Sequence, residues 1–342
     1  MYSNPNKNDK IDKKSNILKN FGEFLRKKIL LILISSLLLY FLLVDVQLHE
    51  IFHSLKTADL ILLLLAFSLH AVGYTISAVR WKILLKSQKV YSKISFLIKS
   101  YLVATFFNHF IPSTIGGDSV RAFDSYKLGN NKAKGIAVIF VDRFLGLLAL
   151  FIFVILSTLF SVEISFLIPN LDLMILVSLL IILLIILFIF NPPLKLFRNL
   201  SEKKNKITRK IGILLLKLSE AFGHFRNKKG QLFQALLLSF LLQANIIVYY
   251  YIISKALGFD IHILNFSLII PVTIFITMFP LSVNGIGIRE NILFFFFSFF
   301  GITKSQAIAY AWIEFGMLLL LGVVGGIIYI TRNTNTLIKS EQ

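Results

Sequence analysis

Long apolar runs dominate this sequence, and they constrain its fold more than any other feature. Six of them are long enough, or nearly long enough, to span the hydrocarbon core of a bilayer. The 342 residues are 56% hydrophobic, which is too apolar for a soluble domain of this length. We therefore expect an all-α polytopic membrane protein with spans at residues 29–44, 58–79, 135–162, 173–190, 231–257 and 305–330.

The positive charge of the chain is gathered in three segments. The formal net charge is +19, and residues 1–28, 80–99 and 192–229 contribute +5, +6 and +9, so the remainder carries about −1. Basic loops between apolar spans mark the cytoplasmic side of a membrane protein and suit anionic inner-leaflet lipids. This pattern predicts that both termini are cytoplasmic. No nucleic-acid partner is expected, because no binding motif accompanies the charge.

The chain divides into one membrane domain and two polar tails. Residues 1–28 are rich in Lys and Asn and are expected to be disordered, and residues 333–342 form a short C-terminal tail. Residues 29–44 are interpreted as a retained first span rather than a signal peptide, because no small-residue cleavage site follows them. The membrane domain is therefore expected to cover residues 29–332.

Three connecting segments carry further expectations. Residues 45–56 are expected to form a short loop on the outer side. The second span is expected to end at a basic loop that starts with Arg80, with Trp81 at the membrane interface. The basic segment 192–229 is expected to contain an amphipathic helix on the cytoplasmic surface. Its apolar positions recur at helical spacing, at Ile211, Leu214, Leu215, Leu218 and Phe222.

Two polar stretches interrupt the apolar pattern. Residues 111–121 read Ile-Pro-Ser-Thr-Ile-Gly-Gly-Asp-Ser-Val-Arg, and residues 280–290 read Pro-Leu-Ser-Val-Asn-Gly-Ile-Gly-Ile-Arg-Glu. If the first stretch belonged to a complete crossing, the basic segment 192–229 would lie outside, against the charge rule. We therefore predict that residues 94–134 and 265–300 are re-entrant helical hairpins, whose irregular backbone is surrounded by protein. The expected turn residues are Pro112, Gly116, Gly117, Pro280, Gly285 and Gly287.

The two hairpins are also related by an internal symmetry. Residues 58–162 and residues 231–330 each read as a span, a hairpin and a span. The first hairpin enters from the inside and the second from the outside. The span that follows each hairpin contains an acid, Asp142 in the first unit and Glu314 in the second. We predict an inverted repeat, which is a recurring plan of transporters.

Several short motifs resemble one known family. They are Asn-His-Phe-Ile-Pro at 108–112, Gly-Gly-Asp-Ser-Val-Arg at 116–121, Asp-Arg-Phe-Leu-Gly at 142–146, and Pro-Leu-Ser with Gly-Ile-Gly-Ile-Arg-Glu within 280–290. Together they resemble the flippase-like membrane domain of lysylphosphatidylglycerol synthases, over most of residues 25–332. Stand-alone members of that family are prokaryotic membrane proteins. Because the sequence ends soon after the last span, the resemblance implies lipid translocation without the synthetic activity, at a prokaryotic plasma membrane.

Charged residues at membrane depth are costly and commonly functional. Asp118 and Arg121 are three positions apart and could pair on one helix face. Helices that start after Gly117 and Gly287 would point their N-termini, which attract phosphate, into the protein. One hypothesis is that Arg121 and Arg289 hold a lipid phosphate at a shared site, while the acids balance it or contact a cationic headgroup. The other is that these charges only neutralise each other. The expected substrate-binding set is Asp118, Arg121, Asp142, Arg143, Arg289, Glu290 and Glu314, with Asn108, Ser113, Ser282 and Asn284 as residues that line the cavity or cap helices.

The sequence therefore predicts a flippase-like transporter that moves a phosphate-bearing amphipathic lipid between leaflets. The alternatives are an ion-coupled transporter of a small anion, a membrane-embedded transferase with Asp118 or Glu290 as base, and a non-transporting partner in cell-envelope synthesis. The sequence lacks cysteine and a phosphate-loop motif, and its histidines show no ligand spacing, so no enzyme activity, cofactor or metal is expected. The expected partners are the lipid substrate and anionic inner-leaflet lipids; a homo-oligomer is left open.

Overall fold

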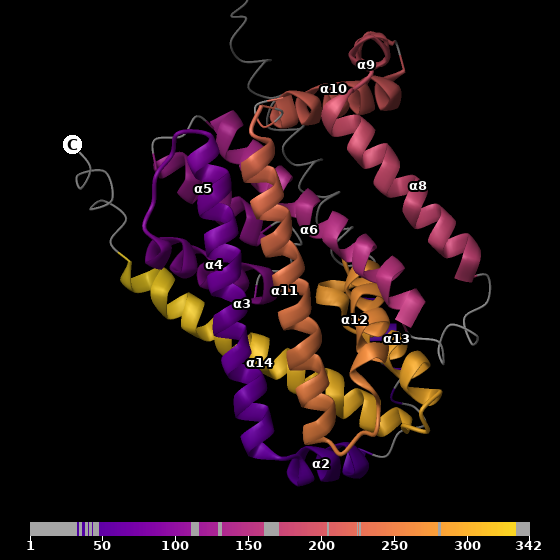
Figure 1. Ribbon diagram of the computed structural model, residues 1–342. Coiled ribbons are helices and arrows are strands. Elements are labelled where there is room, and N and C mark those ends of the chain that lie inside the picture. The colour runs from indigo at the N-terminus through magenta and orange to yellow at the C-terminus, as the bar shows by residue number, and fades with distance from the viewer. Residues whose placement is uncertain are drawn as a thin grey trace, which may run out of the picture.

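A computed structural model shows the fold of this chain (Figure 1). It describes residues 48–110, 116–128, 132–160, 171–203, 205–223, 225, 227–279 and 282–332, together with Leu33, Ser36, Leu37, Tyr40 and Leu43. Several sequence-based expectations lie outside the described residues: the tails at 1–28 and 333–342, most of the span at 29–44, and Pro112, Ser113 and Pro280.

Every regular element in the described part of the chain is a helix, and four of these helices are long and apolar enough to cross a membrane. A fifth long helix, α8, covers the span expected at 173–190. The prediction of an all-α polytopic membrane protein is therefore confirmed. The four candidate spans and α8 are α3 (Leu60–Ser87), α6 (Lys132–Phe160), α11 (Lys229–Ala256), α14 (Lys304–Thr331) and α8 (Leu171–Phe190).

Helix α3 runs further than the sequence pattern indicated. Its start is capped by Asp59, whose carboxylate accepts hydrogen bonds from the Ile61 and Leu62 amides at 2.8 and 3.1 Å. It continues to Ser87 instead of ending at residue 79. Arg80 and Trp81 are therefore buried helical residues rather than parts of a cytoplasmic loop and a membrane interface. The reason is packing, because the basic residues beyond them face outward and leave one side of the helix apolar.

The first predicted hairpin consists of α4 (Ile94–Phe110) and α5 (Gly116–Lys127). The two helices are antiparallel, because Ser100 Oγ donates to Asp124 Oδ2 at 2.7 Å while Asn108 Oδ1 accepts from the Gly117 amide at 2.8 Å. Helix α5 has 12 residues and is about 18 Å long, too short to cross the hydrocarbon core.

The two glycines of this hairpin serve a different purpose from the one expected. Gly116 and Gly117 are the first residues of α5 rather than the reversal itself. A Cβ on Gly117 would lie 2.7 Å from the Ala104 carbonyl oxygen, so the absent side chain lets α5 approach α4 closely.

The second hairpin consists of α12 (Ile263–Thr277), the short 3₁₀ turn η1 (Val283–Gly285) and α13 (Ile288–Ser298). The Phe266 and Phe297 rings at the open end lie 6.0 Å apart. Here the glycines do form the turn: Gly285 and Gly287 have φ of 75° and 83°, in the left-handed region that favours glycine.

Helices of one predicted repeat pack against helices of the other. Helices α3 and α11 pack antiparallel, with Asn245 Nδ2 donating to the Leu69 carbonyl at 3.2 Å and Arg80 Nη1 donating to Ser239 Oγ at 2.8 Å. Helix α14 packs on α4, and α6 packs on α12. In Figure 1, α5 lies in the upper half of the bundle, while α12 and α13 lie in the lower half. This arrangement supports the proposal of an inverted repeat of residues 58–162 and 231–330.

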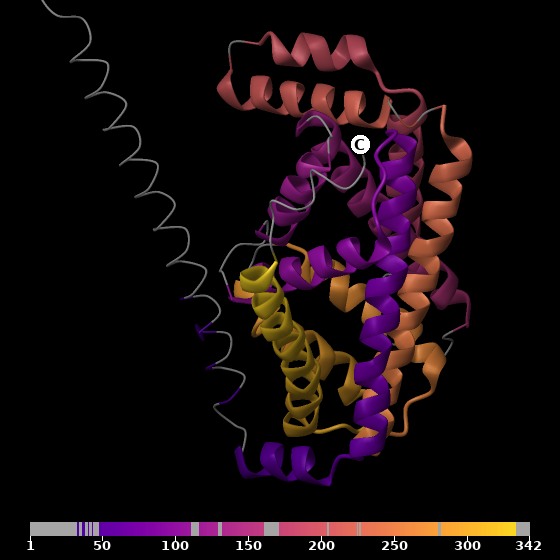
Figure 2. The ribbon, with the colours of Figure 1, turned by 90° about the vertical axis from the view of Figure 1, so that its left-hand side faces the viewer.

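Short helices cover both ends of the bundle (Figures 1 and 2). The segment 192–229 forms two helices, α9 (Leu194–Ser201) and α10 (Lys206–Gly223), where one was expected. Its aromatic anchor is Phe222, which is 1% exposed and packs edge-on against Phe144 of α6. At the other end, residues expected to form a loop contain α2 (Leu48–Thr57), which is tied to α14 by a 2.6 Å hydrogen bond from Ser305 Oγ to Glu50 Oε2.

Candidate functional site

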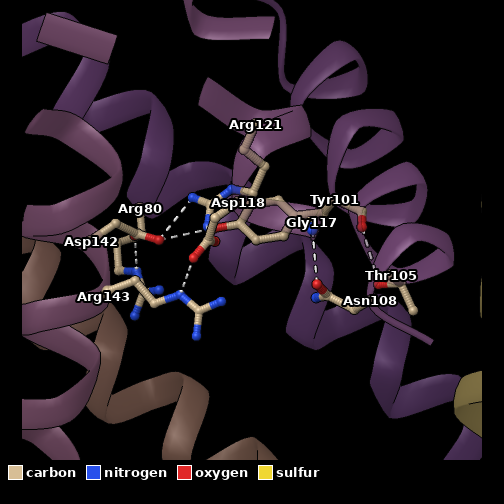
Figure 3. Close-up of polar contacts among 9 residues, drawn as sticks. All are labelled: Arg80, Tyr101, Thr105, Asn108, Gly117, Asp118, Arg121, Asp142 and Arg143. Carbon is tan, nitrogen blue, oxygen red and sulfur yellow. Dashed lines mark hydrogen bonds and ion pairs between the residues drawn. The ribbon is translucent and has the colours of Figure 1, made fainter. Parts of the chain in front are cut away.

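Asp142 of α6 is the centre of a buried polar cluster beside the first hairpin (Figure 3). Its Oδ1 accepts from Arg80 Nε of α3 at 2.7 Å, and its Oδ2 accepts from Arg121 Nη2 of α5 at 2.8 Å. The Tyr101 hydroxyl of α4 also donates to Oδ2, at 3.3 Å. The side chains of Asp142, Arg80 and Arg121 are only 2, 8 and 5% exposed. One carboxylate therefore bridges two buried guanidinium groups.

Two aromatic rings pack against the guanidinium group of Arg121. Its guanidinium carbon lies 4.1 Å from the centre of the Tyr101 ring and 4.7 Å from that of Trp81. This stacking suits arginine, whose planar, weakly hydrated cation is attracted to ring faces. Its Nε has no hydrogen-bond partner among the described residues, so the cluster retains an unused donor.

A second, more open ion pair adjoins the cluster. Asp118 lies 3.7 Å from Arg121 Nη1, as its spacing predicted, and accepts from Arg143 Nε at 2.9 Å. The Arg143 side chain is 45% exposed, and its terminal nitrogens make no interaction with the other residues drawn in Figure 3. Three guanidinium groups thus face two carboxylates, which leaves a formal surplus of one positive charge.

These side chains line a cavity of about 250 Å³. At about 30 Å³ per water, it has room for several waters or a small polar group. Its walls come from both predicted repeats, since α11 contributes Gln243 and the end of α12 contributes Met278. The charged or polar lining residues are Ser77, Arg80, Tyr101, Thr105, Asn108, Asp118, Arg121, Asp142, Arg143 and Gln243.

The second hairpin carries a separate charged cluster. Arg289 of α13 donates to Glu314 Oε2 of α14 at 3.0 Å and to the neighbouring Glu290 Oε1 at 3.1 Å. The other oxygen of Glu290 accepts from the Gly287 amide at 2.7 Å. The three charged side chains are at most 9% exposed.

The seven charged residues expected at one site therefore form two clusters. Arg289, Glu290 and Glu314 do not line the cavity that contains Arg121. At the N-terminus of α13, Glu290 accepts from the amide of the N-cap residue Gly287, so a carboxylate of the helix itself already lies at the end where a phosphate was expected. Asn284 joins the two hairpins instead, donating from Nδ2 to the His109 carbonyl at 3.2 Å. Ser282 is buried beside this turn and does not line the cavity.

Sequence reasoning missed part of the cavity wall. Arg80 was assigned to the basic loop, while Tyr101 and Gln243 were not singled out. The available signal was the buried stripe of α3, since Arg80 and Trp81 are followed by Leu84 and Leu85 at helical spacing. Among the described residues, no group of three His, Cys, Asp or Glu side chains is placed to hold a metal ion.

Fold and site together define a class: a polytopic all-α membrane protein with a buried, net cationic cavity between a short helical hairpin and long spanning helices. Within that class, the chain belongs to the family described as "Lysylphosphatidylglycerol synthase TM region", which it matches over residues 28–326.

Two archaeal relatives are similar over most of their length. The UPF0104 membrane protein PH1989 of Pyrococcus horikoshii is 25% identical over 334 residues, which cover 92% of this chain and all of the relative. A UPF0104 membrane protein of Methanothermobacter thermautotrophicus is 24% identical over 298 residues, which cover 80% of this chain and 87% of the relative.

Proposed function

We propose that this protein moves a phosphate-bearing amphipathic lipid between the leaflets of the plasma membrane. The observation that carries the proposal is the meeting of a cationic cavity with an apolar groove. The groove has a volume of about 340 Å³ and lies between α6, α8 and α12. Leu150 of α6 lines both spaces. A ligand with a charged head and an apolar chain would fit across this shared wall.

The groove has the chemical character of an acyl-chain site. Its lining residues are all apolar: Leu150, Phe151, Val154, Leu173, Val177, Ile181, Pro271, Val272, Phe275 and Ile276. An apolar groove can hold an acyl chain without exposing it to water. In a bilayer, it would keep the chain beside the cavity while the head moves. A transporter of a small anion would need the cavity but not the groove, so the groove favours a lipid.

The cavity would bind the head through its arginines. A guanidinium group forms two parallel hydrogen bonds with a phosphate. The terminal nitrogens of Arg143 contact none of the other residues drawn in Figure 3, and the side chain is 45% exposed beside the cavity. Arg121 is oriented by Asp142 and two aromatic rings. The surplus of one positive charge matches the single negative charge of a phosphodiester. Moving that charge through a polar cavity would avoid most of the cost of exposing it to hydrocarbon.

Reconstituted vesicles test this proposal. The purified protein is placed in vesicles that contain fluorescently labelled phosphatidylglycerol, and the label accessible from outside is bleached over time. We expect wild-type protein to speed exchange between the leaflets and Arg121→Gln to slow it at least tenfold. Arg209→Gln, an exposed arginine on α10, is the matched control and should retain the wild-type rate. Equal rates for Arg121→Gln and wild type, with both folded, would contradict the proposal.

A second arm separates lipid transport from transport of a small anion. Val154→Trp would fill the apolar groove without touching the charged cluster. It should slow the labelled lipid, and the protein should move radiolabelled inorganic phosphate no faster than protein-free vesicles do. Rapid phosphate uptake that is insensitive to Val154→Trp would instead identify a small-anion transporter.

A further inference from the structure

The cluster of the second hairpin contains more negative than positive charge. Glu290 and Glu314 both bind Arg289, so two carboxylates share one guanidinium group. The side chains of these residues are 1, 3 and 9% exposed. If both carboxyl groups were ionised, the cluster would hold one uncompensated negative charge out of contact with solvent. Such a charge is expensive, and a buried acid usually avoids the cost by binding a proton.

Among the residues that the structure describes, no other group packed around the cluster supplies the missing positive charge. Four tyrosines interact electrostatically with Glu314: Tyr310 on the same helix, Tyr249 and Tyr250 from α11, and Tyr74 from α3. Their hydroxyls are neutral. His109 of α4 lies 6.0 Å from the Phe315 ring between ring centres and interacts electrostatically with Arg289, which would repel a second cation. Its Nδ1 is bonded to the Thr105 carbonyl at 2.9 Å.

Hydrogen-bond directions decide which of the two acids takes the proton. Both oxygens of Glu290 accept from N–H groups, one of Arg289 and one of Gly287, and neither group can accept a hydrogen bond from a protonated carboxyl. Glu314 accepts one Arg289 N–H at Oε2, and the Tyr250 hydroxyl, which can accept as well as donate, lies beside its carboxyl group. Of the two acids, Glu314 is therefore the one with a neighbour that can accept a hydrogen bond from the protonated carboxyl group.

We propose that Glu314 binds a single proton and exchanges it with solvent during transport. A metal cation would fit this place poorly, because it needs several oxygen ligands and the Glu290 oxygens are already occupied. The proton site stands on the charge balance of this cluster alone, whereas its exchange during transport rests on the proposed function. The chain would then pair an anion site at its first hairpin with a proton site at its second.

Infrared spectroscopy tests the proton site directly. The full-length protein is studied in dodecyl maltoside, which has no carbonyl group, so that the C=O band of a protonated carboxyl is visible. We expect wild-type protein to show this band at neutral pH and Glu314→Gln to lack it. Glu290→Gln should also lack it, because removing one carboxylate leaves Glu314 ionised opposite Arg289. Asp118→Asn, in the other cluster, is the control and should keep the band. Absence of the band in wild type, or its persistence in both glutamate variants, would overturn the proposal.

Transport under a pH gradient tests the exchange step. With labelled phosphatidylglycerol in vesicles, the wild-type rate should change at least threefold when a gradient is imposed, and Glu314→Gln should lose this response. A wild-type rate that ignores the gradient would overturn proton exchange while leaving the infrared result intact. Failure of the proposed function would look different, because then Arg121→Gln would have no effect on lipid movement at any pH.

Discussion

Each of the two hairpins carries an arginine that pairs with an acid of the next long helix, but the surroundings of the two pairs differ. Arg121 of the first binds Asp142 of the next long helix at 2.8 Å, and Arg289 of the second binds Glu314 at 3.0 Å. Around the first pair, Arg80 and Arg143 add positive charge and a cavity opens. Around the second, Glu290 is the only added charge among the described residues, and the three charged side chains are at most 9% exposed.

This difference shows how a repeated motif can acquire two chemical characters. The common pair positions an arginine in each hairpin, and its neighbours set the sign of the surplus charge. The helix N-termini diverge in the same way. At the start of α5, Asn108 of α4 accepts from the Gly117 amide. At the start of α13, Glu290 of the same helix accepts from the Gly287 amide. The first hairpin is suited to an anion and the second to a proton.

The largest expected effect is on the stability of the first cluster. Asp142→Asn would leave Arg80 and Arg121 buried without their shared counter-charge and should cost about 3–5 kcal/mol of unfolding free energy. Glu314→Gln should cost about 1 kcal/mol or less, because Glu290 still pairs with Arg289 and the amide still accepts its hydrogen bond. Denaturant titration of helical circular dichroism in detergent measures both. Equal losses would remove the distinction between the two clusters.

The next effect concerns the close approach of α5 to α4. Gly117→Ala places a Cβ 2.7 Å from the Ala104 carbonyl oxygen and should cost about 1–3 kcal/mol, since the helix must shift. The shift should also slow lipid movement in vesicles, because Asp118 and Arg121 lie on the same helix. Gly316→Ala is the control, because a Cβ there meets nothing within 4 Å. A fully active, fully stable Gly117→Ala protein would show that this contact is not required.

Replacing Gly285 in the second turn should destabilise the protein through backbone strain rather than through a steric clash. Gly285 has φ of 75°, so Gly285→Ala should lose about 1–2 kcal/mol from the strain of the left-handed conformation. Gly285→Asn should lose less, because asparagine adopts this conformation more readily. Thermal unfolding of the two variants ranks them. The opposite order would mean that crowding against Thr277, 3.2 Å from an added Cβ, dominates over backbone strain.

The smallest expected effect is on the contact between the hairpins. Asn284→Gly keeps the left-handed backbone but removes the hydrogen bond to the His109 carbonyl, which should cost about 1 kcal/mol. Hydrogen exchange at the end of α4 should become faster, because the two turns are less firmly joined. Asn205→Gly, which removes only a bond to the Ile207 amide near α10, should leave α4 unchanged. Unaltered exchange in Asn284→Gly would show that the hairpins are held together by other contacts.

Much of the fold could be read from the residues because the bilayer limits the alternatives. Apolar length predicted the long helices, and the charge rule, which forbids the segment 192–229 from lying outside, predicted that residues 94–134 turn back. The ion pair of Asp118 with Arg121 followed from their spacing on a helix. The end of α3 could not be predicted in this way, because basic residues such as those after Arg80 occur both in loops and on the exposed side of a helix.

The sequence by itself determined the class of the protein, the two hairpins and the charged residues buried with them. Only the tertiary structure decided how those charges are shared, because pairing depends on which helices meet. Arg80 reaches Asp142 across the contact between α3 and α6, and Glu290 turns back onto its own helix. The net charge of a buried cluster depends on which residues from distant segments meet there, and the sequence alone does not show which residues meet.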